Sequence, residues 1–203
     1  MKKNKKNLWA DHYTYQAKKD KYPARSVYKL KEIQKKYRLI KQGNKVLDLG
    51  CAPGSWLIFV SEILGSTGFI TGIDQKKITI KIKTPHEIMV DDIYNVKDMD
   101  SLEGAPFDIV LSDMAPNTTG RKDVDALRSL QLSEVALDMA QKYLRPGGHF
   151  VCKIFQGSDT KEWIDAVKAC FKSHQLYRPK TTRKASKEIY IIGLGMKSPK
   201  KQE

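Results

Sequence analysis

The stretch KVLDLGCAPGSWLIFVSEIL, residues 45–64, decides the fold class. It begins with a short apolar run, passes through the glycine- and proline-containing loop GCAPG at 50–54, and continues with apolar residues at helical spacing. A buried strand, a tight loop and a helix in this order form the first unit of an open α/β sheet. We therefore expect the loop to lie at the carboxyl end of the first strand.

The same alternation continues along the rest of the chain. Apolar runs predict further strands at 68–74, 86–92, 107–114, 149–155, 176–177 and 188–196. Helical patterns predict helices at 24–40, 123–143 and 160–171, and RPGG at 145–148 predicts a turn. Alternating strands and helices favour a parallel sheet, so we expect one doubly wound α/β domain over 23–197. A basic extension at 1–22 and a basic tail at 198–203 flank it.

The composition excludes several classes of protein. The 203 residues are 40% hydrophobic, enough for a core, but no apolar run approaches the ~20 residues that cross a bilayer. The N-terminus is basic and lacks the apolar segment of a signal peptide. Three scattered cysteines predict neither a disulfide framework nor a metal site. We expect a cytoplasmic protein, without membrane contact and monomeric.

The charge is unevenly distributed along the chain. The total is +14, but residues 1–45 carry +12, residues 46–170 carry −5 and residues 171–203 carry +7. Lysines and arginines of 18–45 alternate with tyrosines, a pattern suited to nucleic acid, where cations neutralise phosphates and rings stack on unpaired bases. Buried core tyrosines are the alternative for those rings. The candidate RNA-binding residues are Arg25, Lys29, Lys35, Arg38, Arg121 and Arg183.

Carboxylates stand at or near the ends of four predicted strands. Asp48, Asp74, Asp92 and Asp113 hold these positions, and ligands of such sheets bind beyond the carboxyl ends of the strands. The loop lacks the third glycine of a GxGxxG dinucleotide site, and Asp48 would repel a pyrophosphate. An acidic edge suits S-adenosylmethionine, which carries an ammonium and a sulfonium, with Asp74 accepting from ribose hydroxyls and Asp92 from an adenine amino group. Taken singly, each aspartate has a helix cap or turn as its alternative.

Five motifs carry a resemblance to a known family. They are RSVYKLKEI at 25–33, DLGCAPGSW at 48–56, SDMAPN at 112–117, CKIFQG at 152–157 and SKEIYIIG at 186–193. In this order they resemble the FtsJ (RrmJ)-type ribosomal RNA 2′-O-methyltransferases, over about residues 13–196. The resemblance implies a Rossmann-like fold of S-adenosylmethionine-dependent methyltransferases, with a seven-stranded, mostly parallel sheet and helices on both faces.

The resemblance also implies the site residues. The family's Lys-Asp-Lys-Glu tetrad falls on Lys29, Asp113, Lys153 and Glu188. The candidate cofactor-binding residues are Asp48, Gly50, Pro53, Gly54, Trp56, Asp74, Asp92 and Asp113. For Trp56 a place in the core is the alternative. Cys51, where the family loop often has alanine, is read as a packing residue.

The chemistry explains these residue types without the family. A ribose 2′-hydroxyl must lose its proton to attack a sulfonium methyl group, so a base is needed. Burial and a second nearby ammonium favour a neutral lysine, which predicts Lys153 as the proton acceptor, beside Lys29. No metal is required, because the electrophile carries its own positive charge.

The expected activity is 2′-O-methylation of RNA, and by the resemblance the target is a uridine of large-subunit ribosomal RNA, free or in the subunit. The alternatives are methylation of transfer or cap RNA and a non-catalytic RNA-binding assembly factor. A small-molecule methyltransferase and a NAD(P)-dependent reductase are disfavoured by the basic N-terminal region and by the glycine loop, respectively.

Overall fold

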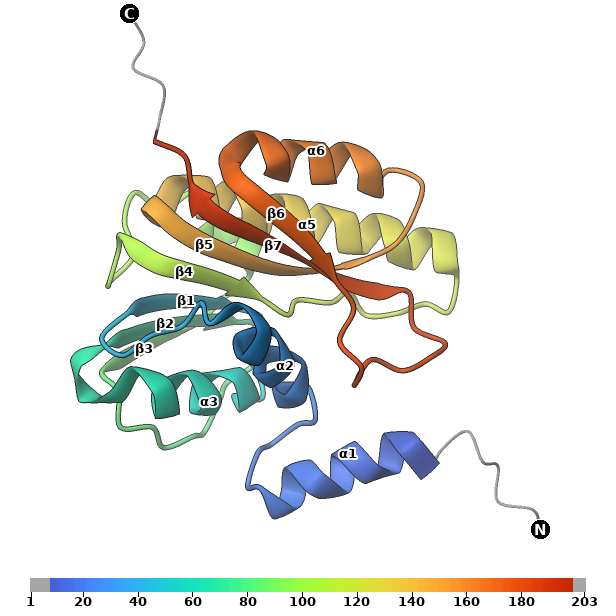
Figure 1. Ribbon diagram of the computed structural model, residues 1–203, viewed down its shortest axis with the longest axis horizontal. Coiled ribbons are helices and arrows are strands. Elements are labelled where there is room, and N and C mark those ends of the chain that lie inside the picture. The colour runs from blue at the N-terminus through green and yellow to red at the C-terminus, as the bar shows by residue number, and fades with distance from the viewer. Residues whose placement is uncertain (1–7, 199–203) are drawn as a thin grey trace, which may run out of the picture.

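A computed structural model describes residues 8–198 of the chain, and it contains one seven-stranded sheet (Figure 1). The strands stand in the order β3-β2-β1-β4-β5-β7-β6. Neighbouring strands are parallel from β3 to β5, and β7 is antiparallel to both β5 and β6. Their bounds are β1 Lys45–Leu49, β2 Phe69–Asp74, β3 His86–Val90, β4 Phe107–Ser112, β5 Leu144–Phe155, β6 Phe171–Tyr177 and β7 Glu188–Met196. The prediction of a seven-stranded, mostly parallel sheet is confirmed.

Helices cover both faces of the sheet. They are α1 Leu8–Lys19, α2 Val27–Tyr37, α3 Ser55–Leu64, α4 Ile93–Val96, α5 Lys122–Tyr143 and α6 Thr160–Cys170, with a 3₁₀ turn at Gly65–Thr67. Figure 1 shows α2 and α3 on one side of the sheet and α5 and α6 on the other. Each pair packs into its own buried apolar cluster against the strands. Within residues 8–198, no helix has the length and apolar character needed to cross a membrane.

The strand β1 shows why the opening stretch folds in this way. Its side chains alternate between faces, so Val46 packs towards α2 and α3 while Leu47 and Leu49 pack into the cluster that contains α5 and α6. A strand buried on both faces requires an almost continuous apolar run. Among the four buried residues of β1, Asp48 is the one polar exception, and the strand leads directly to the glycine loop.

One expected turn is absent. Residues 145–148 lie inside β5, which begins at Leu144 directly after α5. The pairing of β5 with β4 shifts register between Phe107 and Ile109, and Gly147 has a φ of +81°. The strand therefore accommodates the glycines as an irregularity of the ladder, and the prediction of a turn there is wrong.

The predicted basic extension contributes a helix. Of residues 1–22, the first seven lie outside the described part of the chain, and α1 follows them. Ala17 and Tyr22 are buried with Val27 of α2, and the Tyr22 hydroxyl donates to both carboxylate oxygens of Glu62 on α3 at 2.8 Å. The end of the extension is thus packed onto the domain.

The strand order places a crevice at the centre of the sheet. β1 lies between β2 and β4, so the connection after β1 leads to one side and the later chain returns on the other. Ligands of such sheets bind at the carboxyl ends of the strands beside this reversal. The loop 50–54 lies there.

Candidate functional site

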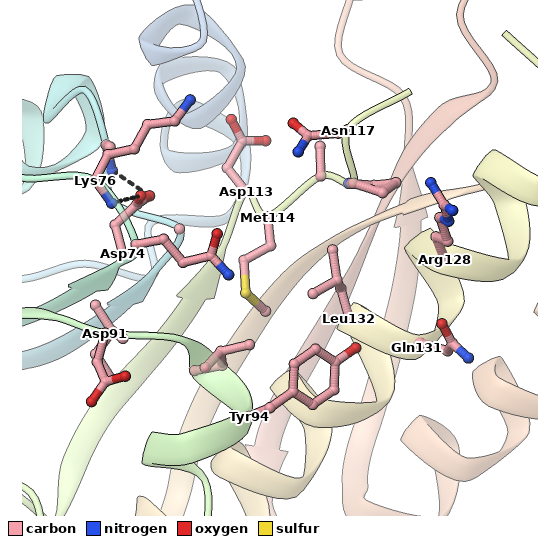
Figure 2. Close-up of a pocket in the computed structure, with 17 residues that line it drawn as sticks. Asp74, Lys76, Asp91, Tyr94, Asp113, Met114, Asn117, Arg128, Gln131 and Leu132 are labelled. Atoms are coloured by element: carbon pink, nitrogen blue, oxygen red, sulfur yellow. Dashed lines mark hydrogen bonds between the residues drawn. The ribbon is translucent and has the colours of Figure 1, made fainter. Parts of the chain in front are cut away.

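A cavity of about 470 Å³ opens at the carboxyl ends of β1, β2 and β4 (Figure 2). This volume lies in the range of small-molecule sites. The cavity is lined by Gly50, Ala52, Ile73, Asp74, Gln75, Lys76, Asp91, Ile93, Tyr94, Asp113, Met114, Ala115, Pro116, Asn117, Arg128, Gln131 and Leu132. No cluster of histidine, cysteine and acidic side chains suited to a metal ion occurs in the described part of the chain.

The glycine loop forms one wall of the cavity. Gly50 has a φ of +76°, and a Cβ on it would come within 2.7 Å of Met114 Cγ. Only glycine allows this backbone conformation together with the close approach of the segment after β4. The loop then enters α3 through Gly54, which precedes the helix with a φ of +99°.

Asp74 joins the loop to the end of β2. Its carboxylate accepts hydrogen bonds from the backbone N–H of Ala52 at 2.9 Å and of Lys76 at 2.8 Å. Figure 2 shows the Asp74 side chain beside the cavity, with Lys76 next to it. A carboxylate oriented by two backbone donors at this strand end can also accept from ligand hydroxyls.

Asp48 lies beneath the loop without exposure to solvent, and neither of its carboxylate oxygens has a hydrogen-bond partner among residues 8–198. Burial raises the pKa of Asp48 well above its ordinary value, and the carboxylates of Asp113 and Asp74 raise it further. Three carboxyl groups near one cavity favour a ligand that carries positive charge. This donor set fits S-adenosylmethionine.

The predicted cofactor residues divide into two groups. Gly50, Asp74 and Asp113 line the cavity, and Asp48 is buried behind it. Four other candidates do not line it, namely Pro53, Gly54, Trp56 and Asp92.

Hydrogen bonds to other parts of the protein explain why Asp92 and Trp56 do not line the cavity. The Asp92 carboxylate caps α4 by accepting from the N–H of Tyr94, and it also accepts from Gln75 Nε2. Trp56 is buried, with its indole N–H donating to the carbonyl of Ser26.

Sequence reasoning missed several lining residues. Tyr94, Arg128 and Gln131 line the cavity, and no motif singled them out. Asp91, at the end of the predicted strand 86–92, and Asn117, in SDMAPN, also line it, although neither was a candidate cofactor ligand. Figure 2 shows Met114 in the centre of the view, Tyr94 below it, Asn117 above it, and Leu132 and Arg128 on the side of α5. Arg128 and Gln131 come from α5, and nothing in a helical pattern reveals which turn faces a cavity.

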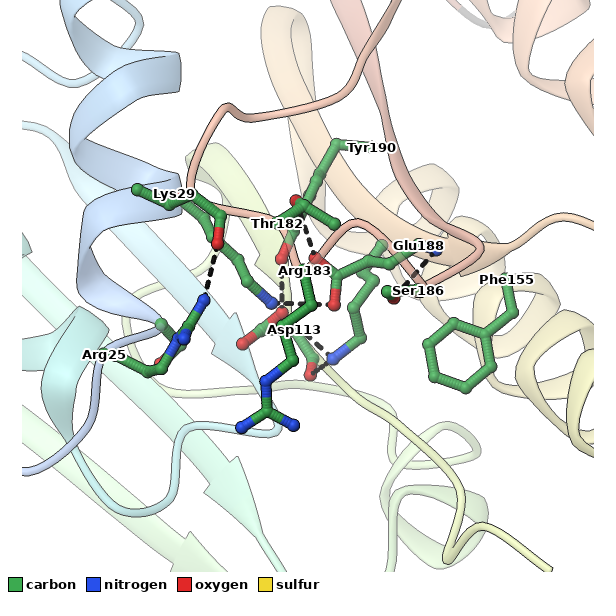
Figure 3. A network of polar contacts seen from close by, with 12 residues as sticks. Arg25, Lys29, Asp113, Phe155, Thr182, Arg183, Ser186, Glu188 and Tyr190 are labelled. Carbon is green, nitrogen blue, oxygen red and sulfur yellow. Dashed lines mark hydrogen bonds and ion pairs between the residues drawn. The ribbon is translucent and has the colours of Figure 1, made fainter. Parts of the chain in front are cut away.

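Beside this cavity the four predicted catalytic residues form one network (Figure 3). Lys29 Nζ of α2 lies 2.7 Å from Glu188 Oε2 of β7. Lys153 Nζ of β5 lies 3.0 Å from Asp113 Oδ1 and also donates to the Asp113 carbonyl. Each ammonium is therefore paired with one carboxylate, and residues up to 159 positions apart meet at one edge of the sheet.

Tyr190 links the two pairs. It is fully buried, its hydroxyl donates to Asp113 Oδ1 at 2.6 Å, and Lys29 Nζ lies 5.9 Å from the centre of its ring. Burial raises the pKa of Tyr190 well above its ordinary value, with the carboxylates of Asp113 and Glu188 adding to it, so the hydroxyl remains a neutral donor. Its position two residues after Glu188 on β7, on the same face, is the signal that could have found it.

Asp113 is held ionised by its neighbours. Burial acts to raise its pKa, but the ammonium groups of Lys153 and Lys29 and the Tyr190 hydroxyl outweigh burial and keep the pKa below its ordinary value. Because Asp113 belongs to both the cavity lining and the polar network, a ligand in the cavity and a reacting group at the network meet at this residue.

The predicted RNA-binding residues lie on three parts of the structure. Lys35 on α2 and Arg38 directly after it are exposed, Arg121 lies before α5, and Arg183 is exposed in the β6–β7 loop. Arg25 is partly buried, and its guanidinium donates to the carbonyl of Thr181 at 2.6 Å. Figure 3 shows Arg25, Lys29 and Arg183 near Asp113 and Glu188.

The arrangement can hold a cationic ligand at the sheet edge and exchange a proton with a second reactant beside it. Lys153 is the lysine that contacts the Asp113 carboxylate, and Lys29 and Glu188 are the adjacent pair. Cys51 of the glycine loop is not a nucleophile, because burial raises the pKa of its thiol far above the ordinary value and the thiol stays protonated.

Comparison with known proteins gives consistent results. The model of the family described as FtsJ-like methyltransferase matches residues 22–196. The chain is 53% identical over 196 residues to the ribosomal RNA large subunit methyltransferase E of Desulforapulum autotrophicum, covering 96% of this chain and 97% of that protein. It is 52% identical over 189 residues to the protein of the same name from Desulfosudis oleivorans, covering 92% and 91%.

A solved structure shows the same architecture. The crystal structure of a ribosomal RNA methyltransferase from Plasmodium falciparum superimposes with a TM-score of 0.72 at 27% identity. The match covers 88% of this chain and all of that one. The Rossmann-like fold of methyltransferases predicted from the motifs is thereby confirmed.

Proposed function

Since the chain belongs to the FtsJ-like methyltransferase family, we propose that it methylates the 2′-hydroxyl of a ribose in large-subunit ribosomal RNA, with S-adenosylmethionine as the methyl donor. The observation that carries this proposal is the polar network, in which Lys29, Asp113, Lys153 and Glu188 meet beside a cavity with an acidic wall. The identity of the relatives, named for large-subunit ribosomal RNA, supports the target.

The acidic wall of the cavity is suited to the cofactor. Asp74, oriented by the N–H groups of Ala52 and Lys76, is placed to accept from ribose hydroxyls. Asp113, which its neighbours keep ionised, supplies negative potential near a cationic group. When bound, the cofactor supplies an electrophilic methyl group on a positively charged sulfur.

Lys153 is the proposed proton acceptor. In its neutral form, Nζ takes the proton of the 2′-hydroxyl as the oxygen takes the methyl group. Asp113 orients Nζ by a contact of 3.0 Å, and Tyr190 in turn orients Asp113. The Lys29–Glu188 pair closes the other side of the network, so the hydroxyl is held in line rather than free to rotate.

The basic surface near the network is suited to bind the phosphates of the RNA substrate. Lys35, Arg38 and Arg183 are exposed and suited to phosphates, while Arg25 and Lys29 lie closer to the reacting groups.

We further propose that the target nucleotide is a uridine and that the protein acts as a cytoplasmic monomer. Size-exclusion chromatography with light scattering tests the oligomeric state.

The test of the function is transfer of labelled methyl groups from S-adenosylmethionine to three substrates: large ribosomal subunits, naked ribosomal RNA and transfer RNA. After alkaline hydrolysis, label in an alkali-resistant dinucleotide marks the ribose 2′-oxygen, and the sequence of that dinucleotide identifies the site. We expect label from ribosomal substrate only. Label on a base refutes the mechanism, label in transfer RNA alone refutes the target, and binding to RNA without transfer favours an assembly factor.

A further inference from the structure

The loop 178–187 connects β6 to β7 and ends at Glu188, the first residue of β7. It carries five exposed cations, Arg178, Lys180, Arg183, Lys184 and Lys187. Arg178 ties the loop internally, because its guanidinium donates to the carbonyls of Arg183, Lys184 and Ser186 at 2.7–3.3 Å. The loop is therefore a compact unit that leads directly into Glu188, whose backbone pairs with Phe155 of β5.

One side chain of α2 holds this unit. The two carboxylate oxygens of Glu32 accept from adjacent backbone amides, Oε2 from the N–H of Lys180 at 2.8 Å and Oε1 from the N–H of Thr181 at 3.0 Å. Glu32 Oε2 also lies 3.3 Å from the hydroxyl of Tyr177, which donates to it at the end of β6. Glu32 thus accepts three hydrogen bonds across a gap of about 145–149 positions in sequence.

This contact leads directly to the catalytic network. Thr182, the residue after the bound amides, is buried and its hydroxyl donates to Glu188 Oε1 at 3.3 Å. The other oxygen, Glu188 Oε2, receives Lys29 Nζ at 2.7 Å. Lys29 stands three residues before Glu32, on the same face of α2. The helix therefore meets the loop at two neighbouring points, one through Glu32 and one through Lys29.

We propose that Glu32 is a positioning residue of the reaction: by binding the Lys180 and Thr181 amides it seats the β6–β7 loop on α2 and sets the register of Lys29 against Glu188. This inference rests on the proposed function. Glu32 touches neither the cavity nor the reacting groups, and it acts through Thr182 and Glu188. Because charge-assisted hydrogen bonds of a carboxylate to two adjacent amides are strong and directional, one side chain can fix the loop.

A second role follows for the basic loop. When the loop is bound to α2, its cations lie at the same edge as Lys35 and Arg38. Glu32 therefore holds both the residues that can contact phosphates and the segment that leads into Glu188. Loss of Glu32 is therefore expected to lower turnover more than RNA affinity, since the cations remain in place on a looser loop.

The test compares Glu32→Ala and Glu32→Gln with the wild-type protein in full-length form. Glu32→Ala is expected to lower kcat for RNA methylation by about tenfold to a hundredfold, because small displacements of a catalytic group cost rates of this order. The KM for S-adenosylmethionine should stay within threefold. Glu32→Gln keeps one acceptor oxygen and should fall between Glu32→Ala and wild type.

Hydrogen exchange provides a readout that does not depend on activity. The amides of Lys180 and Thr181 should exchange faster in Glu32→Ala, while those of the central strand β1 keep their protection. Glu62→Ala is the matched control, because Glu62 also accepts hydrogen bonds that tie the N-terminal part of the chain to the domain, through Tyr22. Glu62→Ala should retain kcat within twofold.

A double-mutant cycle separates positioning from general destabilisation. If Glu32 acts through Glu188, adding Glu32→Ala to Glu188→Ala should lower kcat by less than twofold further. An undiminished further loss overturns the proposal, as does wild-type turnover in Glu32→Ala or unchanged protection of the two amides. A wild-type protein that methylates no RNA instead refutes the proposed function, and this inference with it.

Discussion

The stability of Asp48→Asn relative to the wild type should increase from pH 5 to pH 7. Asp48 is fully buried without a partner for its oxygens among residues 8–198, and burial, followed by Asp113 and Asp74, raises its pKa. A group whose pKa is raised on folding contributes stability that is complete below its unfolded pKa of about 3.9 and is lost as the pH rises through the folded value. Asparagine cannot ionise, so the variant does not lose this contribution.

The size of the effect follows from proton linkage. Where the folded protein keeps one proton that the unfolded chain has released, stability falls by about 1.4 kcal/mol per pH unit. Between pH 5 and pH 7 the wild type can therefore lose up to about 2.7 kcal/mol relative to Asp48→Asn. That is a large share of the ~5–15 kcal/mol of a typical domain. Any cost of burying the asparagine amide is the same at both pH values and cancels in the difference.

The assay is urea unfolding of both proteins at pH 5, 6 and 7, followed by circular dichroism, with the free energy of unfolding extrapolated to zero denaturant. Asp138→Asn is the control, because Asp138 is exposed on α5 and its carboxylate is solvated in both states. If the difference in unfolding free energy between wild type and Asp48→Asn changes by less than about 0.5 kcal/mol from pH 5 to pH 7, the reasoning is wrong.

Three further predictions concern the site and the basic surface. Lys153→Ala should lower methyl transfer by about 10²–10⁴-fold, the usual contribution of a general base, while affinity for S-adenosylmethionine by calorimetry changes no more than a few fold; wild-type turnover contradicts the assignment. Gly50→Ala should weaken cofactor binding at least tenfold, because its Cβ would press on Met114 at 2.7 Å and its φ is +76°; unchanged affinity in the same assay shows that the loop adapts. Lys35→Ala combined with Arg38→Ala should weaken RNA binding and reduce the slope of log affinity against log salt by up to about two in filter binding; an unchanged slope removes both residues from the interface.

The sequence determined the fold to a large extent because local patterns carried it. The apolar run of β1, the glycine loop and the start of α3 are contiguous in the chain, so their order alone indicated the first unit of a doubly wound sheet. The same holds for β4 and β5, whose apolar runs are separated by α5. The prediction of a turn at 145–148 is wrong because Leu144 already pairs with Phe107 of β4, so these residues form an irregularity inside β5 instead of a connection before it.

For the site, the sequence supplied residue types and the tertiary structure supplied partners. The carboxylates at strand ends could be named because parallel strands end at one edge. That the Asp92 carboxylate caps α4, that Tyr190 binds Asp113, and that Asp48 has no partner among the described residues depend on neighbours distant in sequence.

The same distinction separates Lys29 from Glu32. Both stand on the basic helix predicted from the sequence, and a motif singled out Lys29. Glu32 was not singled out, because its partners, the amides of Lys180 and Thr181, lie about 150 positions away in the sequence. Periodicity reports which face of an element is buried, whereas a hydrogen bond needs two groups within about 3 Å at a suitable angle. The sequence alone thus determined the sheet and the types of residue at its edge. Only the packing of α2 against the β6–β7 loop decided that Glu32 holds the loop that leads to Glu188.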